Sequence, residues 1–260
     1  PVVRVERDEC AVGGAANVAA NVAALGAVTE VVGLVGDDPS GERLRRGLEQ
    51  MGARTSGLVV AAERPTTVKT RVLARRQQVV RFDREDSSDV AGPLATELVR
   101  AVERAADGCD VVILEDYNKG VLVPAVIDAV RTLAGARGIP VVVDPKRLRF
   151  FAYEGVTVFK PNAKELSDAL GAPLEPDDPE WMDSVRRRLD CRNLLLTLGE
   201  DGVALSSEDA GYLRVPTVAR GVYDVSGAGD TVISVVAVAL AVGASPAEAA
   251  ILANHAAAVE

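Results

Sequence analysis

The sequence predicts an α/β protein in which a mostly parallel sheet lies between layers of helices, with a small antiparallel sheet beside it. Short apolar runs alternate with helix-like segments along most of the 260 residues. Hydrophobic residues make up 48% of the chain and aromatic residues only 3%, so Ala, Val and Leu must build the core. Such a composition suits a sheet covered by closely packed helices. Near residues 66–83, two strand-like runs follow each other without a helix between them.

The strands expected in the main sheet are short, rich in Val, Leu or Ile, and bounded by Gly, Asp or Pro. They cover residues 29–35, 110–114, 140–143, 157–160 and 193–198. Helices are expected over 15–25, 41–51, 93–106, 123–136, 163–170, 180–189 and 232–242. This order predicts right-handed βαβ units within one domain that spans residues 1–260.

The smaller sheet is expected from residues 66–74 and 78–83, with a further short strand over residues 2–6. Its boundaries are placed at about residues 1–9 and 57–85. A small sheet beside the main domain suits a lid over a ligand or a dimer interface, since an exposed sheet edge invites pairing. We therefore expect a homodimer formed through this lid.

Charge and motif content exclude several classes of function. The formal net charge of −9 argues against a nucleic-acid surface over the whole protein. Apolar runs stay well short of the roughly 18 residues that a membrane span needs, so a cytoplasmic protein without a membrane partner is expected. The sequence contains neither a P-loop motif nor the dinucleotide-binding glycine fingerprint.

The strongest local signal is the glycine-rich turn at residues 224–231, directly before an apolar helix. Amides of Gly227, Ala228 and Gly229 at a helix start would form a site for an anion such as a transferring phosphoryl group. Asp230 could accept a proton from an attacking hydroxyl at the same place. The alternative is an ordinary turn in which Asp230 is the helix N-cap.

A second glycine-rich turn precedes the first helix. Gly13 and Gly14 would let a ligand approach the backbone closely, and Asn17 offers a side-chain amide to sugar hydroxyls. Close packing of the helix on the sheet would explain the same residues.

These two turns carry a resemblance to a known family. Residues 13–27 resemble the first signature of the ribokinase (PfkB) carbohydrate kinases, and residues 224–231 resemble the second. The resemblance covers essentially the whole chain and implies a ribokinase-like fold. It also implies an ATP-dependent phosphotransferase with an alcohol group as acceptor, in which Asp230 is the catalytic base and Gly227, Ala228 and Gly229 form the anion hole.

Further segments resemble the family's nucleotide site. Residues 160–165 are similar to its Asn-x-x-Glu element, which implies that Asn162 and Glu165 help to place Mg²⁺ and phosphates, with Glu165 acting indirectly. Residues 197–202 resemble the loop beside the nucleotide. The nucleotide-binding residues implied by the resemblance are Asn162, Ala163, Lys164, Glu165, Thr197, Gly199, Gly202, Asp224 and Asn254. A helix cap or a hairpin turn would explain each one taken singly.

The acceptor is suggested by a local reversal of charge. Seven basic residues and one acid lie between positions 64 and 84 of an acidic protein. A cationic strand face would suit a sugar that already bears a phosphate, although a solvated or intersubunit face would look the same. Residues 64–83, 115–120 and 143–146 resemble the D-glycero-β-D-manno-heptose 7-phosphate kinases. The substrate-binding residues expected are Gly13, Gly14, Asn17, Lys69, Arg71, Arg81, Asp116, Lys119 and Lys146.

Two other interpretations stay open. The same mechanism could serve fructose 6-phosphate, ribose or another sugar. The second interpretation is a non-catalytic regulator that has the kinase fold and binds a sugar or nucleotide. The presence of Asp230 beside Gly227 and Gly229 argues against this regulator.

Overall fold

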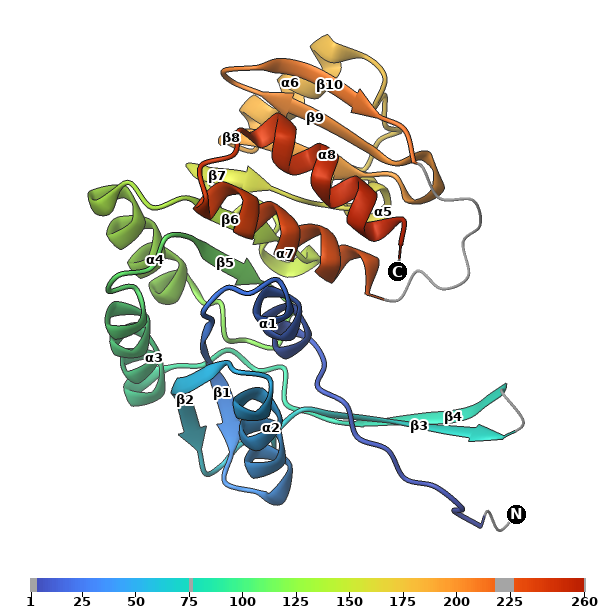
Figure 1. Ribbon diagram of the computed structural model, residues 1–260. Coiled ribbons are helices and arrows are strands. Elements are labelled where there is room, and N and C mark those ends of the chain that lie inside the picture. The colour runs from blue at the N-terminus through green and yellow to red at the C-terminus, as the bar shows by residue number, and fades with distance from the viewer. Residues whose placement is uncertain (1–3, 75–76, 218–226, 260) are drawn as a thin grey trace.

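A six-stranded sheet forms the centre of the larger part of the molecule (Figure 1). The computed structural model describes residues 4–74, 77–217 and 227–259. The strand order is β10-β9-β8-β7-β6-β5, with β5 to β8 parallel and with β9 and β10 antiparallel to their neighbours. The strands are β5 (Val112–Glu115), β6 (Val141–Asp144), β7 (Val156–Phe159), β8 (Cys191–Thr197), β9 (Val203–Ser207) and β10 (Gly211–Val215).

Helices cover both faces of this sheet because its strands alternate between two apolar clusters. Val141 and Val143 point into the cluster beneath α4 (Pro124–Arg137), α5 (Ala163–Leu170) and α6 (Pro179–Arg188). Val142 points to the opposite face, which is covered by α1 (Ala15–Ala24), α7 (Ala228–Ala241) and α8 (Pro246–Ala257). Among the described helices, none combines the length and the apolar character that crossing a membrane would require.

A second parallel pair of strands lies apart from the main sheet. β1 (Glu30–Gly36) pairs with β2 (Arg54–Ala61), and α2 (Pro39–Gln50) connects them. α3 (Gly92–Ala105) packs on β2 and on α4, so it joins this unit to the six-stranded sheet. The prediction that residues 29–35 belong to the main sheet is therefore wrong for the described structure: their hydrogen-bonding partner is β2.

The small antiparallel sheet is confirmed as a two-stranded ribbon of β3 (Val68–Ala74) and β4 (Gln77–Arg84), which projects from the body (Figure 1). Its expected boundaries need two corrections. Residues 57–61 belong to β2, because they pair with residues 32–36 of β1. Residues 4–6 are not in a strand, since residues 4–11 are exposed and have no ladder partner; residues 2–3 lie outside the described residues.

The junction between β1, α2 and the ribbon depends on one carboxylate. Asp38 is the N-cap of α2: its Oδ1 accepts from the amide of Gly41 at 2.8 Å, and its Oδ2 accepts from the amide of Thr66 at 2.9 Å. The Thr66 hydroxyl in turn accepts from the amide of Gly36 at 2.8 Å. A β-carbon on Gly36 would lie 2.5 Å from the Arg64 carbonyl oxygen, so only glycine fits this crossing.

We expect Asp38→Ala to lower the free energy of unfolding by about 1–2 kcal/mol at pH 7, because it removes a cap and leaves two amides unpaired. Burial raises the pKa of Asp38, but hydrogen bonds from Thr66 and Gly41 outweigh it and the pKa lies below its ordinary value. A lowered pKa stabilises the fold above the unfolded value of about 3.9, and the contribution disappears as pH falls through the folded-state value.

Urea unfolding at pH 7 and at pH 3.5 would measure this difference. The difference in the free energy of unfolding between the wild type and Asp38→Ala should be smaller at pH 3.5 than at pH 7. Asp38→Asn, which keeps the shape of the side chain, serves as the control. An unchanged gap at the two pH values would contradict the role assigned to the charge.

Candidate functional site

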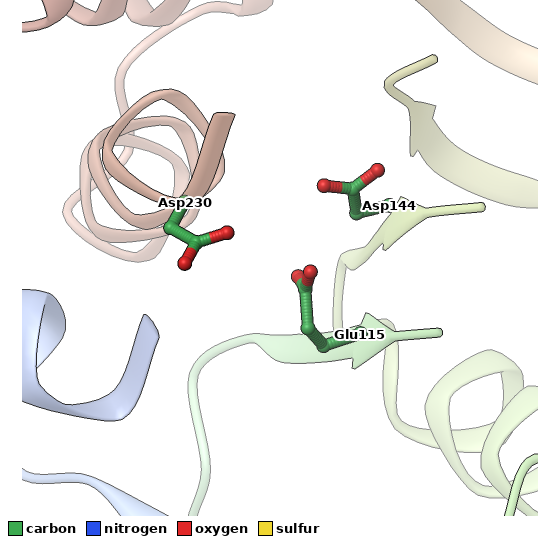
Figure 2. A group of neighbouring side chains, drawn as sticks. All are labelled: Glu115, Asp144 and Asp230. Atoms are coloured by element: carbon green, nitrogen blue, oxygen red, sulfur yellow. The ribbon is translucent and has the colours of Figure 1, made fainter. Parts of the chain in front are cut away.

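Three carboxylates converge at the carboxyl ends of the parallel strands, where open α/β sheets bind their ligands. Glu115 ends β5, Asp144 ends β6, and Asp230 lies in the first turn of α7. Their oxygen atoms lie within 4.8 Å of one another, and Figure 2 shows the three side chains pointing into one space. We call Glu115, Asp144 and Asp230 the carboxylate cluster.

Two lysines neutralise part of this charge. Lys160 follows β7 and places its ammonium 3.0 Å from Asp144, with 3% and 5% of the two side chains exposed. Lys146 lies 3.5 Å from Asp144 and also forms an ion pair with Glu165. Burial lowers the pKa of Lys146, but the charges of Asp144 and Glu165 outweigh this effect and raise the pKa above its ordinary value. Lys146 is therefore charged at neutral pH.

Glu115 is the member of the cluster without a hydrogen-bonding partner. Both of its carboxylate oxygens are buried and lack such a partner within the described parts of the chain. Burial, followed by the charge of Asp144, raises the pKa of Glu115 to about 9. Four carboxylates, the three of the cluster and that of Glu165, face two ammonium groups, so the site has an excess of negative charge that a cation or a bound proton can relieve.

Asp230 is held by hydrogen bonds from two separate elements. The Asn17 amide in α1 donates to Oδ2 at 2.8 Å, and the Tyr117 hydroxyl in the loop after β5 donates to Oδ1 at 3.1 Å. Gly227, with a φ of 108°, is the N-cap of α7. The alternative in which Asp230 caps the helix is therefore wrong, and its carboxylate faces the cluster instead.

The predicted anion hole lies against a buried cation. Gly227, Ala228 and Gly229 form the N-terminus of α7, whose first amides have no acceptor within the helix. A β-carbon on Gly229 would be 3.7 Å from the ammonium of Lys160. The helix N-terminus and the ammonium can both act on one anion at this point.

The two positions before α1 differ in whether the structure requires glycine. Gly14 is the N-cap with a φ of 60°, and a β-carbon on it would be 3.5 Å from the Tyr117 ring. A β-carbon on Gly13 would meet no atom within 4 Å. Backbone conformation therefore favours glycine at position 14, while position 13 is open on the side of a groove.

That groove has a volume of about 2610 Å³ and extends between β1 and β5. Most residues expected to bind the substrate line it, which brings the first turn, the ribbon and the loop after β5 to one space. Asn17 and Lys146 are not among its lining residues and lie beside Asp230 and Glu165 respectively. The expected residues that do line it are Gly13, Gly14, Lys69, Arg71, Arg81, Asp116 and Lys119.

In the loop after β5, Asp116 has an internal role. It is buried, and its Oδ1 accepts from the amide of Asn118 at 2.7 Å. Its Oδ2 accepts from the Tyr153 hydroxyl at 2.8 Å. Both oxygens thus shape the loop that presents Tyr117 and Lys119. Sequence reasoning did not select Tyr117, although it lies inside the segment 115–120 that carried the resemblance.

The ribbon gathers four charged side chains on one face. Lys69 lies opposite Asp83 and Arg71 opposite Arg81, so these side chains share one face. Ion pairs run from Arg81 through Asp83 to Lys69, and from Lys69 through Glu85 to Lys119. The cationic face therefore continues to the loop beside Asp230, but two acids compensate it, which sequence reasoning underestimated.

The segment expected at the nucleotide begins with a helix cap. Asn162 and Glu165 form a reciprocal capping box at the start of α5, where Ala163 is the first helical residue. The Glu165 carboxylate is engaged by the Asn162 amide and by Lys146, so it could act on a metal only through water. Lys164 is 81% exposed and pairs with Asp168, away from the cluster.

The neighbouring loop continues the sheet. Thr197 forms a bridge with Asn162, and its amide donates to the Pro161 carbonyl at 3.1 Å. Gly199 begins η2 (Gly199–Asp201), a short 3-10 helix, while η1 (Arg147–Arg149) follows Lys146. A β-carbon on Gly202 would lie 2.2 Å from a carbonyl oxygen, so glycine is required there.

The structure describes Asn254 but not Asp224, the two remaining residues expected at the nucleotide. Asn254 in α8 is buried, and its amide donates to the Pro216 carbonyl at 2.9 Å, which ties α8 to the chain after β10. Asp224 lies outside the described residues.

Comparison with known proteins identifies the family. Residues 1–260, the whole chain, match the family described as pfkB family carbohydrate kinase. The chain belongs to this family. The family resemblance seen in the two glycine-rich turns is thereby confirmed, as is the ribokinase-like fold.

Curated relatives of this pfkB-family protein are longer than the chain. It is 43% identical over 261 aligned residues to the bifunctional protein HldE of Citrifermentans bemidjiense, which covers 99% of the chain and 53% of that protein. It is 46% identical to the bifunctional protein HldE of Azorhizobium caulinodans, with 95% of the chain and 52% of that protein covered. The chain thus spans about half the length of these relatives.

Solved structures agree on the fold of this pfkB-family protein. Arabidopsis thaliana ribokinase in complex with ribose and ATP has a TM-score of 0.72 at 24% identity, over 94% of this chain and 78% of that one. Phosphofructokinase-2 from Escherichia coli in complex with fructose-6-phosphate has a TM-score of 0.76 at 21% identity, over 95% and 81%.

We expect Lys160→Met to lower the free energy of unfolding by about 3–5 kcal/mol, because it leaves the buried charge of Asp144 poorly compensated. Lys164→Met is the matched control: its ion pair with Asp168 is exposed and should contribute less than about 0.5 kcal/mol. Urea unfolding at pH 7 measures both. Equal losses in the two variants would show that the Lys160–Asp144 pair is not a structural centre of the site.

Proposed function

We propose that the protein is an ATP-dependent kinase that phosphorylates the anomeric hydroxyl of D-glycero-β-D-manno-heptose 7-phosphate, giving the 1,7-bisphosphate. One observation carries the kinase chemistry. The Asp230 carboxylate lies one residue after the Gly227–Gly229 turn, at the N-terminus of α7, with the Lys160 ammonium beside that turn. A proton acceptor and an anion site are thus adjacent, which is what phosphoryl transfer requires.

In this mechanism Asp230 takes the proton of the acceptor hydroxyl as the hydroxyl oxygen attacks the γ-phosphorus, and the bond from that phosphorus to ADP breaks. The α7 amides and Lys160 stabilise the negative charge that spreads over the phosphoryl oxygens. Asn162, Ala163, Lys164, Thr197, Gly199, Gly202, Asp224 and Asn254 are proposed to bind the nucleotide. Among them, Asn162 and Thr197 are adjacent in the described structure.

Mg²⁺ is the metal that such chemistry implies, and the site fits it. The two buried oxygens of Glu115, which have no hydrogen-bonding partner among the described residues, and the excess of carboxylates over ammonium groups suit a divalent cation. Glu165 would hold the ion through water, and Glu115 with Asp144 would face it. When bound, Mg²⁺ neutralises and orients the phosphates of ATP.

The choice of acceptor rests on the ribbon and on the relatives. The cationic face with Lys69, Arg71 and Arg81 leads to Lys119, and it suits a second phosphate on the sugar. Identity to the HldE proteins is 43% and 46%, against 24% to the ribokinase and 21% to the phosphofructokinase-2. This difference favours the heptose phosphate over ribose and fructose 6-phosphate. The lipopolysaccharide-precursor route and a cytoplasmic location belong to the same proposal.

A homodimer formed through the ribbon is also proposed. The face opposite the cations carries Val80 and Phe82, which are 48% and 58% exposed. A lone two-stranded ribbon is marginally stable in water, so a second copy would both cover these side chains and stabilise the strands.

The substrate prediction is tested by Mg²⁺-dependent release of ADP with a panel of acceptors. D-glycero-D-manno-heptose 7-phosphate should exceed fructose 6-phosphate and ribose by more than about 100-fold in kcat/KM, or about 2.7 kcal/mol of transition-state discrimination. Asp230→Asn should lower kcat by about 10³-fold with the protein still folded. A preference for another sugar would refute the acceptor. Full turnover by Asp230→Asn would refute the base, and no turnover with any acceptor would favour the regulator.

The dimer prediction is tested by light scattering over a concentration series. The wild type should have the mass of two chains, and Phe82→Glu should have the mass of one, because a charge would be buried in the interface. Val242→Glu, at a position that is 79% exposed at the end of α7, is the control and should remain dimeric. A monomeric wild type would exclude this interface.

A further inference from the structure

Tyr117 contacts the proton acceptor directly but has no role in the proposed mechanism. Its hydroxyl donates to Asp230 Oδ1 at 3.1 Å, across a separation of 113 residues in the chain. The other oxygen of the same carboxylate accepts from Asn17 at 2.8 Å. A carboxylate held at both oxygens, from two different elements, cannot rotate about its Cβ–Cγ bond without losing one of these hydrogen bonds.

The ring of Tyr117 is itself fixed from two directions. On one side it lies against the start of α1, where a β-carbon on Gly14 would be 3.5 Å from the ring. Lys146 places its ammonium 5.8 Å from the ring centroid. Tyr117 thus contacts both the first glycine turn and a lysine that pairs with Asp144 and Glu165.

The backbone that presents Tyr117 is equally constrained. Asp116, just before it, accepts from the Asn118 amide and the Tyr153 hydroxyl. Asn118, just after it, has a φ of 53°, and its side-chain oxygen accepts from the Leu148 amide at 3.3 Å. A tight, internally bonded loop of this kind sets the position of one side chain well, which general base catalysis requires.

We propose that Tyr117 is a positioning residue that holds the Asp230 carboxylate in the orientation needed for proton transfer. This inference rests on the proposed kinase function, with Asp230 as the base. In the step, the acceptor hydroxyl gives its proton to Asp230 while its oxygen forms the new bond to the γ-phosphorus. The bond from that phosphorus to ADP breaks, and Tyr117 keeps its own proton throughout. Loss of the Tyr117 hydroxyl should therefore slow the chemical step and leave substrate binding nearly unchanged.

The test is the kinetics of Tyr117→Phe, which removes the hydroxyl and retains the ring against Gly14. We expect kcat to fall about 10- to 100-fold, with the KM values for ATP and for the sugar phosphate changed less than about two-fold. Tyr153→Phe is the matched control, since it removes the same atom from a tyrosine that supports the same loop through Asp116. It should lower kcat much less than Tyr117→Phe does, because Asp116 still accepts from the Asn118 amide, and urea unfolding of each variant reports on folding separately.

The outcomes distinguish the inference from the function on which it rests. Wild-type kcat in Tyr117→Phe, together with an inactive Asp230→Asn, would overturn the role of Tyr117 and leave the kinase mechanism intact. Equal losses of kcat in Tyr117→Phe and Tyr153→Phe would also overturn it, because order of the loop would then explain the effect. Full turnover by Asp230→Asn would instead refute the base itself.

Discussion

The buried ion pair between Lys160 and Asp144 is the interaction on which the site depends. Parallel strands end at one edge of a sheet, so β5, β6 and the segment after β7 bring their terminal side chains together whatever their charge. Three carboxylates meet there, and burial would make them unfavourable without a counter-charge. Lys160 supplies that charge and also lies against the N-terminus of α7. One ammonium thereby stabilises the edge of the sheet and contributes to an anion site.

Much of the fold could be predicted because parallel strands buried on both faces appear as short apolar runs. β5 to β8 and the helices between them were found in this way. β2 was missed because its first four residues, Arg54 to Gly57, are polar or glycine and leave only a short apolar run. The N-terminal strand was predicted from an alternating pattern alone, but residues 4–6 pair with no other described segment. Which strands pair with each other depends on the folded chain and cannot be read from a short stretch of sequence.

In the candidate site, too, some residues could be recognised from local sequence and others could not. Asp230 and the glycines before α7 could be recognised because a short turn before an apolar helix determines their geometry locally. Glu115 and Lys160 could not, since their importance arises from strand order, which brings them to Asp144 from 29 and 16 positions away in the chain. Tyr117 belongs to this second group. Asp116 and Asn162 illustrate the reverse case, in which residues of the expected type also act as a loop brace and a helix cap.

The attachment of the ribbon has a mechanical consequence. The Arg64 guanidinium donates to the carbonyl oxygens of Asp86, Ser88 and Lys119, which clamps the base of the ribbon to the loop beside Asp230. β3 contains seven residues beyond this clamp, a lever of about 23 Å at roughly 3.3 Å per residue. A rotation of about 10° at the base would therefore carry the far end of β3 through about 4 Å. A contact made far out on the ribbon could thus be transmitted, through one arginine, to the loop that carries Tyr117 and Lys119.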